Sequence, residues 1–331
     1  MPKFSLIVPV YNRPDEVLEL IQSLEKQTVK HFELIIVEDG SDLPCEEICQ
    51  KYEDKFVLKY FFKSNSGRSE TRNYGMERAT GDYFVFFDSD CILSPNYFEN
   101  LEKNLSENYS DCFGGPDKAH ESFSDVQKAI NFAMTSFLTT GGIRGGKNQM
   151  EKFKPRTFNM GFSRAVYEKV GGFKNMFGED IDLSIRIDDA GFRTTLYQDV
   201  FVYHKRRVSF KKFYKQVNNF GAGRINLAIL HKNSLKLVHT APAVLLVGLF
   251  VIILLSIFCS SLWLVLPAIY TLLLFADALI KTKKIKTAIL SVWASFIQIT
   301  AYGIGFLKSF FQKIVFCKGL ESEEVLKKVY K

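Results

Sequence analysis

The sequence predicts an α/β domain with a mainly parallel sheet, followed by C-terminal transmembrane helices, and two observations carry this prediction. Strand-like and helix-like segments alternate from residue 3 to residue 90, a pattern typical of a parallel sheet with helices on both faces. Two later runs, residues 240–280 and 287–307, contain a single charged residue, Asp277. A bilayer-spanning helix needs about 20 apolar residues, so both runs are long enough to insert into a membrane.

The first part of the chain contains four predicted strands. Each is a run of aliphatic, β-branched or aromatic residues bounded by polar turns: residues 3–10, 32–39, 56–62 and 83–88. Three helices are predicted between them. The first opens with Pro14, a residue that favours the first turn of a helix, and runs to about residue 27. The second passes through Glu47 and Tyr52, and the third covers residues 66–79.

After Gly115 the alternation becomes less regular. A helix is predicted at residues 124–137, and the glycine-rich, basic stretch at residues 139–156 is typical of a mobile loop. The remaining predicted elements are a strand at residues 158–164, a helix at residues 178–191 and a strand at residues 199–204.

Polar side chains follow each of the four predicted strands. Because ligands bind beyond the carboxyl ends of strands in parallel sheets, these side chains are expected at one ligand-binding edge. The clusters are Tyr11 with Asn12, Glu38 with Asp39, residues 64–68, and Asp88 with Asp90. Two carboxylates at the end of a buried strand repel each other unless a cation lies beside them, and their oxygens suit Mg²⁺ or Mn²⁺. The alternative is a solvated turn in which an aspartate acts as a helix cap before Pro95.

The apolar runs predict the membrane topology in part. Residues 240–280 can form two spans with a break near Ser260 and Ser261, and residues 287–307 can form a third span, a re-entrant segment or an interfacial helix. Basic residues precede the first span and follow the second, so both flanks are expected in the cytoplasm. Three full spans would place the basic tail outside, against the same rule. The predicted regions are a cytoplasmic domain at residues 1–236, a membrane region at residues 237–310 and a basic tail at residues 311–331.

The composition favours a membrane partner over nucleic acid. The net charge is +7, but many basic residues lie beside the apolar runs, where anionic membrane lipid is the simpler partner. The six cysteines have no metal-binding spacing, and Cys45 and Cys49 are only four residues apart, which fits reduced thiols in the cytosol. The N-terminal apolar stretch is too short for a secretory signal.

Several motifs, in order, resemble those of family 2 glycosyltransferases, the inverting enzymes with the GT-A fold. The motifs are SLIVPVYNR from Ser5, VEDGS from Val37, GRSETRNYG from Gly67, DSD from Asp88 and GEDIDLSIR from Gly178. The resemblance spans most of the first 200 residues and implies a Rossmann-like mixed sheet that binds a nucleotide-diphosphate sugar. With the apolar runs, it implies a membrane-anchored bacterial enzyme at the inner cell membrane, with its catalytic domain in the cytoplasm.

The resemblance also implies nucleotide-binding residues. In the family, the aspartate of the V-D-D-G-S turn recognises the base, which corresponds to Asp39 here, with Glu38 in place of the commoner aspartate. Pro9 and Tyr11 resemble the wall against which the nucleotide packs. Arg72 resembles a residue of the nucleotide pocket, with an exposed helix charge as the alternative.

Metal ligands and a catalytic base follow from the same resemblance. Asp88 and Asp90 correspond to the D-x-D motif, in which the second aspartate binds a divalent ion, Mn²⁺ or Mg²⁺, and the first also belongs to the nucleotide site. Glu179 and Asp180 match an acidic pair at a helix start, whose second member serves as general base; helix capping is the alternative. His204 resembles a histidine that completes the metal shell in several GT-A enzymes, and the alternative is a structural role.

The implied reaction is transfer of a sugar, with a UDP-sugar as the expected donor, to a hydroxyl of a lipid-linked or other membrane-associated glycan acceptor. The segment QVNNFGAGR lacks the tryptophan of the Q-x-x-R-W motif of processive synthases, which favours transfer of one sugar. Residues 139–156 and 159–173 are expected to set specificity. A polyprenyl-phosphate sugar synthase is the alternative enzyme, and an inactive membrane scaffold is the alternative of another class.

Two other enzyme classes fit the sequence poorly. Phosphatases of the haloacid dehalogenase type also end a strand in D-x-D, but they usually carry Thr or Val where Ile92 stands, and they use the first strand rather than the fourth. A dinucleotide-dependent oxidoreductase would need a G-x-G-x-x-G motif after the first strand, and the sequence has none there.

Overall fold

The computed structural model describes residues 3–141, 153–232 and 234–316, which form two compact units. The first unit comprises residues 3–120 and 153–205, and the second comprises the described residues of 121–141 and 206–316. The cytoplasmic domain predicted at residues 1–236 stays a prediction. In the structure, residues 121–141, 206–232 and 234–236 belong to the same unit as the apolar helices. Most of the predicted specificity loop, residues 142–152, lies outside the described residues.

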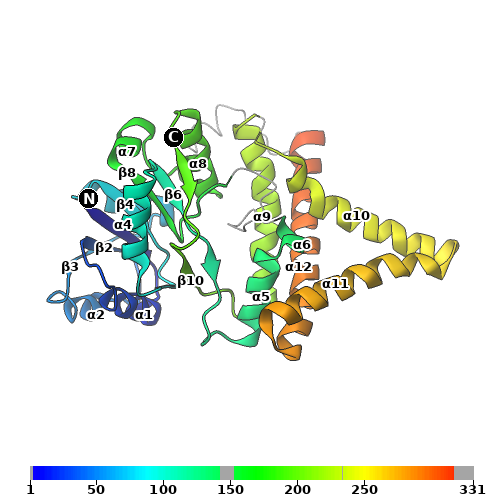
Figure 1. The fold of residues 1–331 in the computed structure, drawn as a ribbon. Helices are drawn as coiled ribbons and strands as arrows, with labels where there is room; N and C mark the ends of the chain where they lie inside the picture. Colours follow the sequence, from blue (N-terminus) through cyan, green and yellow to red (C-terminus); the bar gives the residue numbers. More distant parts are fainter. Residues whose placement is uncertain (1–2, 142–152, 233, 317–331) are drawn as a thin grey trace. The chain divides into compact units, whose positions relative to one another are not determined.

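Among the described residues, the first unit is built on a seven-stranded mixed sheet with the strand order β3–β2–β1–β4–β8–β6–β9 (Figure 1). Its strands are β1 (Phe4–Val10), β2 (Phe32–Asp39), β3 (Val57–Lys63), β4 (Tyr83–Phe86), β6 (Cys112–Gly114), β8 (Met160–Ser163) and β9 (Thr194–Leu196). The first four strands are parallel, as their alternation with helices predicts, and β8 is antiparallel to both β4 and β6. The α/β class is therefore confirmed, with β8 making the sheet mixed.

A second, smaller sheet lies in the same unit. It contains β5 (Cys91–Leu93), β10 (Val202–His204) and β7 (Asp117–Lys118), with β10 in the middle. Strand β10 is antiparallel to β5 and parallel to β7. This arrangement brings residues from three distant parts of the chain together immediately after the end of β4.

Helices cover both faces of the large sheet because the strands bury side chains on both faces. The helices of this unit are α1 (Pro14–Glu25), α2 (Glu46–Gln50), α3 (Arg68–Arg78), α4 (Tyr97–Glu107), α7 (Arg164–Val170) and α8 (Glu179–Asp189). Successive side chains of a strand point to opposite faces. Accordingly, Leu6 and Val8 of β1 pack in the core that includes α1 and α4, whereas Ile7 packs in the core that includes α3 and α8.

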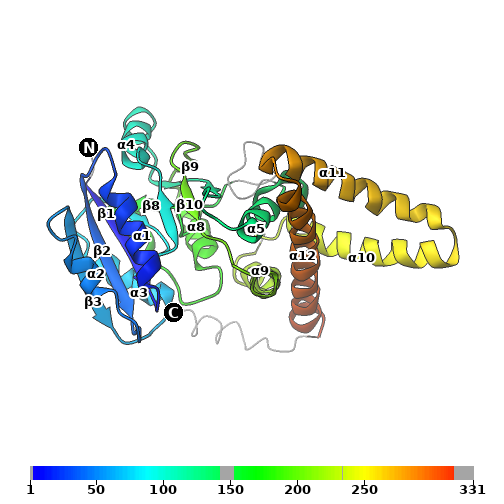
Figure 2. The same ribbon diagram turned by 90° about the horizontal axis from the view of Figure 1, so that it is seen from below.

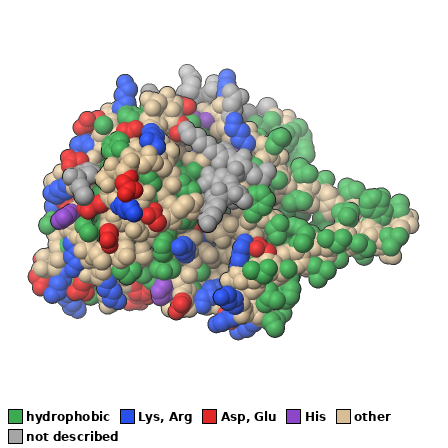
Figure 3. Space-filling view, in the orientation of Figure 1, with side chains coloured by type: hydrophobic (Ala, Val, Ile, Leu, Met, Phe, Trp, Pro, Cys, Tyr) green, Lys and Arg blue, Asp and Glu red, His purple; other side chains and the backbone are tan. Residues whose placement is uncertain are grey.

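The second unit is helical in its described part. It contains α5 (Asp125–Thr135), α6 (Phe137–Thr140), α9 (Phe210–Leu230), α10 (Leu237–Phe258), α11 (Val265–Thr282) and α12 (Ile285–Phe310). A 3₁₀ turn, Ser261–Leu264, separates α10 from α11 where Ser260 and Ser261 predict a break. Within the part of the chain that the structure describes, three helical segments are long and apolar enough to cross a membrane: α10, α11 with the preceding turn, and α12 with its continuation. Figure 3 shows hydrophobic side chains over the α10–α11 hairpin.

Candidate active site

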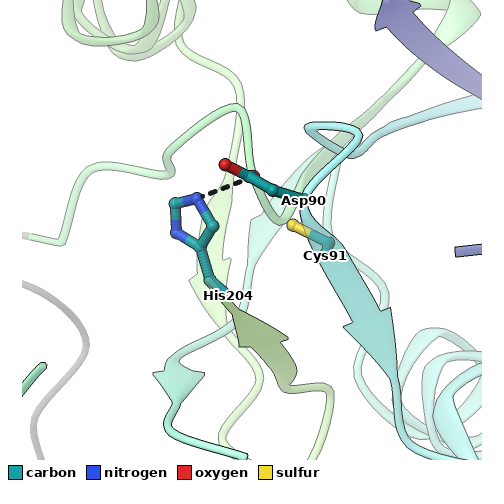
Figure 4. Close-up of side chains that lie close together, drawn as sticks. All are labelled: Asp90, Cys91 and His204. Carbon is teal, nitrogen blue, oxygen red and sulfur yellow. Dashed lines mark ion pairs between the residues drawn. The ribbon is translucent and has the colours of Figure 1, made fainter. Parts of the chain in front are cut away.

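The centre of the candidate site is a pair formed by Asp90 and His204. In the small sheet, His204 of β10 lies opposite Cys91 of β5, so its side chain reaches the residue just before β5. The Nε2 atom of His204 lies 3.1 Å from Oδ1 of Asp90, and both side chains are largely buried, with exposed fractions of 15% and 12% (Figure 4). The two residues are 114 positions apart in sequence, and strand pairing brings them into contact.

Three other side chains hold this pair in place. Arg13, which follows β1, donates through Nη1 to Oδ2 of Asp90 over 3.2 Å. The ring of Phe158 stacks on the imidazole of His204, with 4.7 Å between ring centroids. Asp117, whose side chain has no exposed surface, places Oδ2 3.8 Å from Nδ1 of His204. A carboxylate beside the second ring nitrogen is the usual partner that fixes the orientation of a metal-binding histidine.

The donor atoms of this cluster fit a divalent cation. One donor atom each from Asp90, Cys91 and His204 lie within 4.8 Å of one another. Burial raises the pKa of the Cys91 thiol, which donates to the carbonyl oxygen of Phe158 over 3.4 Å, so the protonated thiol is a poor ligand. The carboxylate oxygen and the imidazole nitrogen remain, and this donor set suits Mn²⁺ and, through the carboxylate, Mg²⁺.

A second network joins the D-x-D turn to the start of α8 through Arg72. Arg72 is 2% exposed. Its Nη2 donates to Asp88 over 2.6 Å, and its Nη1 donates to Glu179 over 3.1 Å. Arg68 also donates to Glu179, over 2.7 Å. Direct nucleotide contact by Arg72 therefore stays a prediction, since both of its Nη groups contact carboxylates.

The acidic pair at the start of α8 separates into two environments. Glu179 is 2% exposed, and burial together with the charge of Asp180 raises its pKa, although Arg72 and Arg68 act in the opposite direction. Asp180 is more accessible, with 18% of its side chain exposed, and its Oδ2 lies 3.9 Å from Nη1 of Arg156. Asp180 is thus the member of the pair that can reach a bound molecule.

Asp39 closes the loop that precedes α3. It is 5% exposed and accepts hydrogen bonds from the backbone N–H groups of Ser66, over 2.9 Å, and Gly67, over 3.0 Å, and it pairs with Lys63. Burial opposes ionisation, but the hydrogen bond from Lys63 and those from the loop lower the pKa of Asp39 overall. The predicted contact of Asp39 with a nucleotide base would have to coexist with these bonds, and it stays a prediction.

The loops after β1 and β2 are tied to each other. Asn12 has a φ of 54°, donates its backbone N–H to Ser41 over 2.7 Å and accepts from the N–H of Asp42 over 2.7 Å. Tyr11, directly before this bend, is 50% exposed, and Pro9 is partly buried at the end of β1. An exposed aromatic ring on a fixed loop is available to a ligand, and the nucleotide contacts of Tyr11 and Pro9 stay predictions.

Glu38, which stands in place of the commoner aspartate, has a structural role in the protein interior. It has no exposed surface, receives a hydrogen bond from the Ser41 hydroxyl, and accepts from the backbone N–H and the thiol of Cys45, each over 2.9 Å. The longer glutamate side chain thus anchors the start of α2.

Three residues of the site were not predicted from the sequence: Arg13, Asp117 and Phe158. Arg68 and Arg156 lie in stretches that were predicted, residues 64–68 at the ligand edge and residues 139–156 as a specificity loop, but without roles of their own. Arg13 directly follows the Tyr-Asn pair, so its position was an available signal, whereas Asp117 and Phe158 carried no such signal. Asp117 approaches His204 because β7 pairs with β10, a contact that the local sequence does not predict.

The chain belongs to glycosyl transferase family 2, which matches residues 5–171, just over half of the sequence. This match covers β1 to β8 and the D-x-D turn. It confirms the resemblance that the motifs predict.

Curated relatives and a solved structure agree with this assignment. An uncharacterized glycosyltransferase of Rickettsia conorii is 42% identical over 109 residues, which cover 32% of this chain and 18% of the relative, so this chain spans under a fifth of that protein. Glycosyltransferase AglE of Haloferax volcanii is 26% identical over 265 residues, covering 75% of this chain and 81% of the relative.

The solved structure is the mannosyltransferase PcManGT of Pyrobaculum calidifontis, in complex with GDP-Man and Mn²⁺. The TM-score is 0.65 at 16% identity, with 92% of this chain and 87% of the other covered. At that identity the likeness supports the GT-A fold alone.

Proposed function

We propose that this protein is an inverting glycosyltransferase that moves a sugar from a nucleotide-diphosphate donor, most simply a UDP-sugar, to a hydroxyl of a membrane-associated or lipid-linked acceptor. The observation that carries the proposal is the contact of Asp90 with His204. This contact lies at the ligand-binding edge of the sheet in a chain that belongs to a glycosyltransferase family. The setting would be surface polysaccharide or glycolipid synthesis on the cytoplasmic side of a bacterial cell membrane.

In this proposal, Asp90 and His204 hold a divalent ion, Mn²⁺ or Mg²⁺. When bound, the ion offsets the charge that builds up on the departing nucleoside diphosphate. Asp117 and Phe158 keep the imidazole oriented, and Arg13 supplies a positive charge beside Asp90. Tyr11, which is exposed directly after β1, stacks on the nucleotide.

Asp180 is the proposed general base. An inverting transfer needs one carboxylate to take the proton of the acceptor hydroxyl while its oxygen attacks the anomeric carbon. Asp180 is accessible and faces Arg156, whereas Glu179 is enclosed by Arg68 and Arg72. Glu179 therefore acts as a positioning residue that holds the start of α8.

A polyprenyl-phosphate sugar synthase is the second candidate, because the apolar helices of the second unit also suit a lipid phosphate acceptor. A phosphate oxygen is already ionised and needs no strong base. Asp180→Asn should therefore abolish transfer to a hydroxyl but leave transfer to a phosphate nearly unchanged. The matched control is Asp189→Asn, because Asp189 is an exposed carboxylate at the end of the same helix.

The first experiment is calorimetry of the detergent-purified full chain with UDP, GDP and dTDP, with Mn²⁺ and again with chelator. Binding of one nucleotide that requires the metal and disappears in Asp90→Asn would support the proposal. If none of the nucleotides binds although the wild-type protein is folded, the hypothesis of an inactive membrane scaffold replaces that of an enzyme. With an active donor, NMR of the product should give the anomeric configuration opposite to that of the donor, and retention would overturn the inverting assignment.

A further inference from the structure

The third apolar helix, α12, differs from the first two in how it is packed. In the most apolar stretch of α10, 6% of the residues are buried, and in the stretch that includes α11 the share is 11%. In α12 the share is 50%. Helices that face lipid all around should be exposed in the isolated protein, as α10 and α11 are. Half of α12 instead faces protein.

The buried face of α12 consists mainly of small residues and includes several polar ones. Its buried residues are Thr287, Ala288, Ser291, Ala294, Ser295, Gln298, Ile299, Ala301, Gly303, Gly305, Phe306 and Ser309. Two glycines bring α12 and α9 into backbone contact: a Cβ added at Gly305 would lie 2.1 Å from the oxygen of Asn218, and one at Gly221 would lie 2.2 Å from the oxygen of Tyr302. The packing of α12 on α9 is therefore close.

Helix α9 accompanies α12 along much of its length and is too charged for the bilayer core. Asn218 donates to the carbonyl of Ala301 over 3.1 Å, and farther along Lys313 donates to Asn226 over 2.7 Å. On the outer side of α9, three lysines are exposed, Lys211, Lys212 and Lys215. If α12 crossed the membrane, α9 would cross beside it and carry these charges into hydrocarbon, where charged side chains are strongly unfavourable.

The exposed face of α12 is an apolar stripe with basic residues at both ends. The stripe contains Ile285, Ile289, Trp293 and Ile304, which are 66%, 58%, 60% and 42% exposed, and Phe311 of the following turn, which is 47% exposed. Lysines lie near its two ends, Lys284 and Lys286 near the first and Lys308 and Lys313 near the second. A spanning helix with lysines at both ends would violate the charge rule at one of them, whereas an interfacial helix would not.

The direction of α12 agrees with this distinction. Figures 1 and 2, two views of the unit at right angles, both show the α10–α11 hairpin extended in one direction, with α12 running across it. If the hairpin is aligned with the membrane normal, α12 lies near the membrane plane.

We propose that α12 is an in-plane helix at the membrane surface and that the chain crosses the bilayer only twice, by α10 and α11. The apolar stripe of α12 faces the lipid interface, and α9 and α5 cover its polar face on the aqueous side. Thr287 and Lys286 at the start of α12 bind Asp125 of α5, at 3.0 Å and 3.1 Å, which ties the polar face to that side. The inference does not depend on the proposed reaction.

Cysteine accessibility in intact cells tests the two-span topology. The native Cys259, exposed at the turn between α10 and α11, marks the far side, and Cys317→Ser is introduced in every variant. Cysteines are then placed, one at a time and with Cys259→Ser, at two exposed positions, Lys284→Cys and Gln312→Cys. A membrane-impermeant maleimide should label Cys259 in intact cells and the two introduced cysteines only after permeabilisation. Labelling of Gln312→Cys in intact cells, with Cys259 also labelled in the variant that keeps it, would show a third span and overturn the proposal.

Tryptophan depth provides a second measurement on the full chain in vesicles. In Trp263→Phe, the remaining Trp293 should be quenched more strongly by lipids spin-labelled near the headgroup than by lipids labelled near the bilayer centre. The control is Phe250→Trp in α10, with both native tryptophans changed to Phe, for which the order should be reversed. Stronger quenching of Trp293 by the deep label, with the control behaving as expected, would refute the in-plane helix.

Discussion

Replacing Gly305 with alanine should destabilise the second unit, whereas the same change at Gly248 should not. Both glycines lie inside apolar helices, α12 and α10 respectively. A Cβ at Gly305 would lie 2.1 Å from the backbone oxygen of Asn218, well inside the ordinary contact distance of about 3.5 Å, so α9 and α12 must move apart. At Gly248 nothing lies within 4 Å of the added atom.

The expected effects have opposite signs. Overpacking at a close contact costs about 1–3 kcal/mol, and this outweighs the gain of up to about 1 kcal/mol that alanine gives over glycine inside a helix. Gly305→Ala should therefore lower the free energy of unfolding by about 1–2 kcal/mol, whereas Gly248→Ala should leave it unchanged or raise it slightly. At roughly 2–4 °C per kcal/mol, the two melting temperatures should differ measurably.

The assay is thermal unfolding of both variants and the wild-type protein in one detergent, followed by circular dichroism. A Gly305→Ala protein that melts at or above the wild-type temperature would refute the close α9–α12 packing, and with it one support for the in-plane helix. Equal destabilisation by both variants would show instead that the detergent-solubilised helices tolerate no added methyl group.

Three further predictions concern the first unit. Arg72→Met should lower the free energy of unfolding by about 3–5 kcal/mol, because it leaves the buried carboxylate of Glu179 without its principal partner. Chemical denaturation would measure this loss, and a loss below about 1 kcal/mol would contradict the prediction. Asp117→Asn should weaken Mn²⁺ binding about 10–100-fold while the melting temperature changes little, as measured by electron paramagnetic resonance of free Mn²⁺; unchanged affinity would remove Asp117 from the site. Burial raises the pKa of Glu33, but hydrogen bonds from Lys59, Ser5 and Thr80 outweigh it and lower this pKa to about 2. The stability that ionised Glu33 contributes is therefore present above its ordinary pKa and is lost as the pH falls from about 4.5 toward 2. With Lys59 partly exposed, that contribution is about 2–3 kcal/mol, and Glu33→Gln should flatten the acid limb of stability against pH by this amount; parallel curves for the variant and the wild type would refute it.

The sequence was most informative where local pattern decides structure. Apolar runs bounded by turns predict β1 to β4, and the alternation with helices predicts that these strands are parallel. The D-x-D turn could be located because a buried strand that ends in two carboxylates is unusual on physical grounds alone. The antiparallel β8 could not be inferred, since strand order depends on packing between distant segments.

Contacts between residues far apart in sequence could not be predicted from local sequence patterns for the same reason. The approach of Asp117 to His204 depends on the pairing of β7 with β10, and the approach of Arg72 to Glu179 depends on how α3 and α8 cover one face. For α12 the sequence does carry a signal, because Thr287, Ser291 and Ser295 recur every four residues and mark a protein-facing side of an otherwise apolar run.

Four charged side chains, those of Arg68, Arg72, Asp88 and Glu179, form one group, which limits the residues that these positions can accept. Arg72 and Arg68 carry two positive charges, and Asp88 and Glu179 carry two negative ones, so the group is neutral only as a whole. Losing one member leaves an uncompensated charge at a partly desolvated position, whereas losing an opposite pair restores neutrality. Variation here is therefore expected to be coupled, and a library randomised at all four positions should return folded proteins in which acidic and basic residues disappear together.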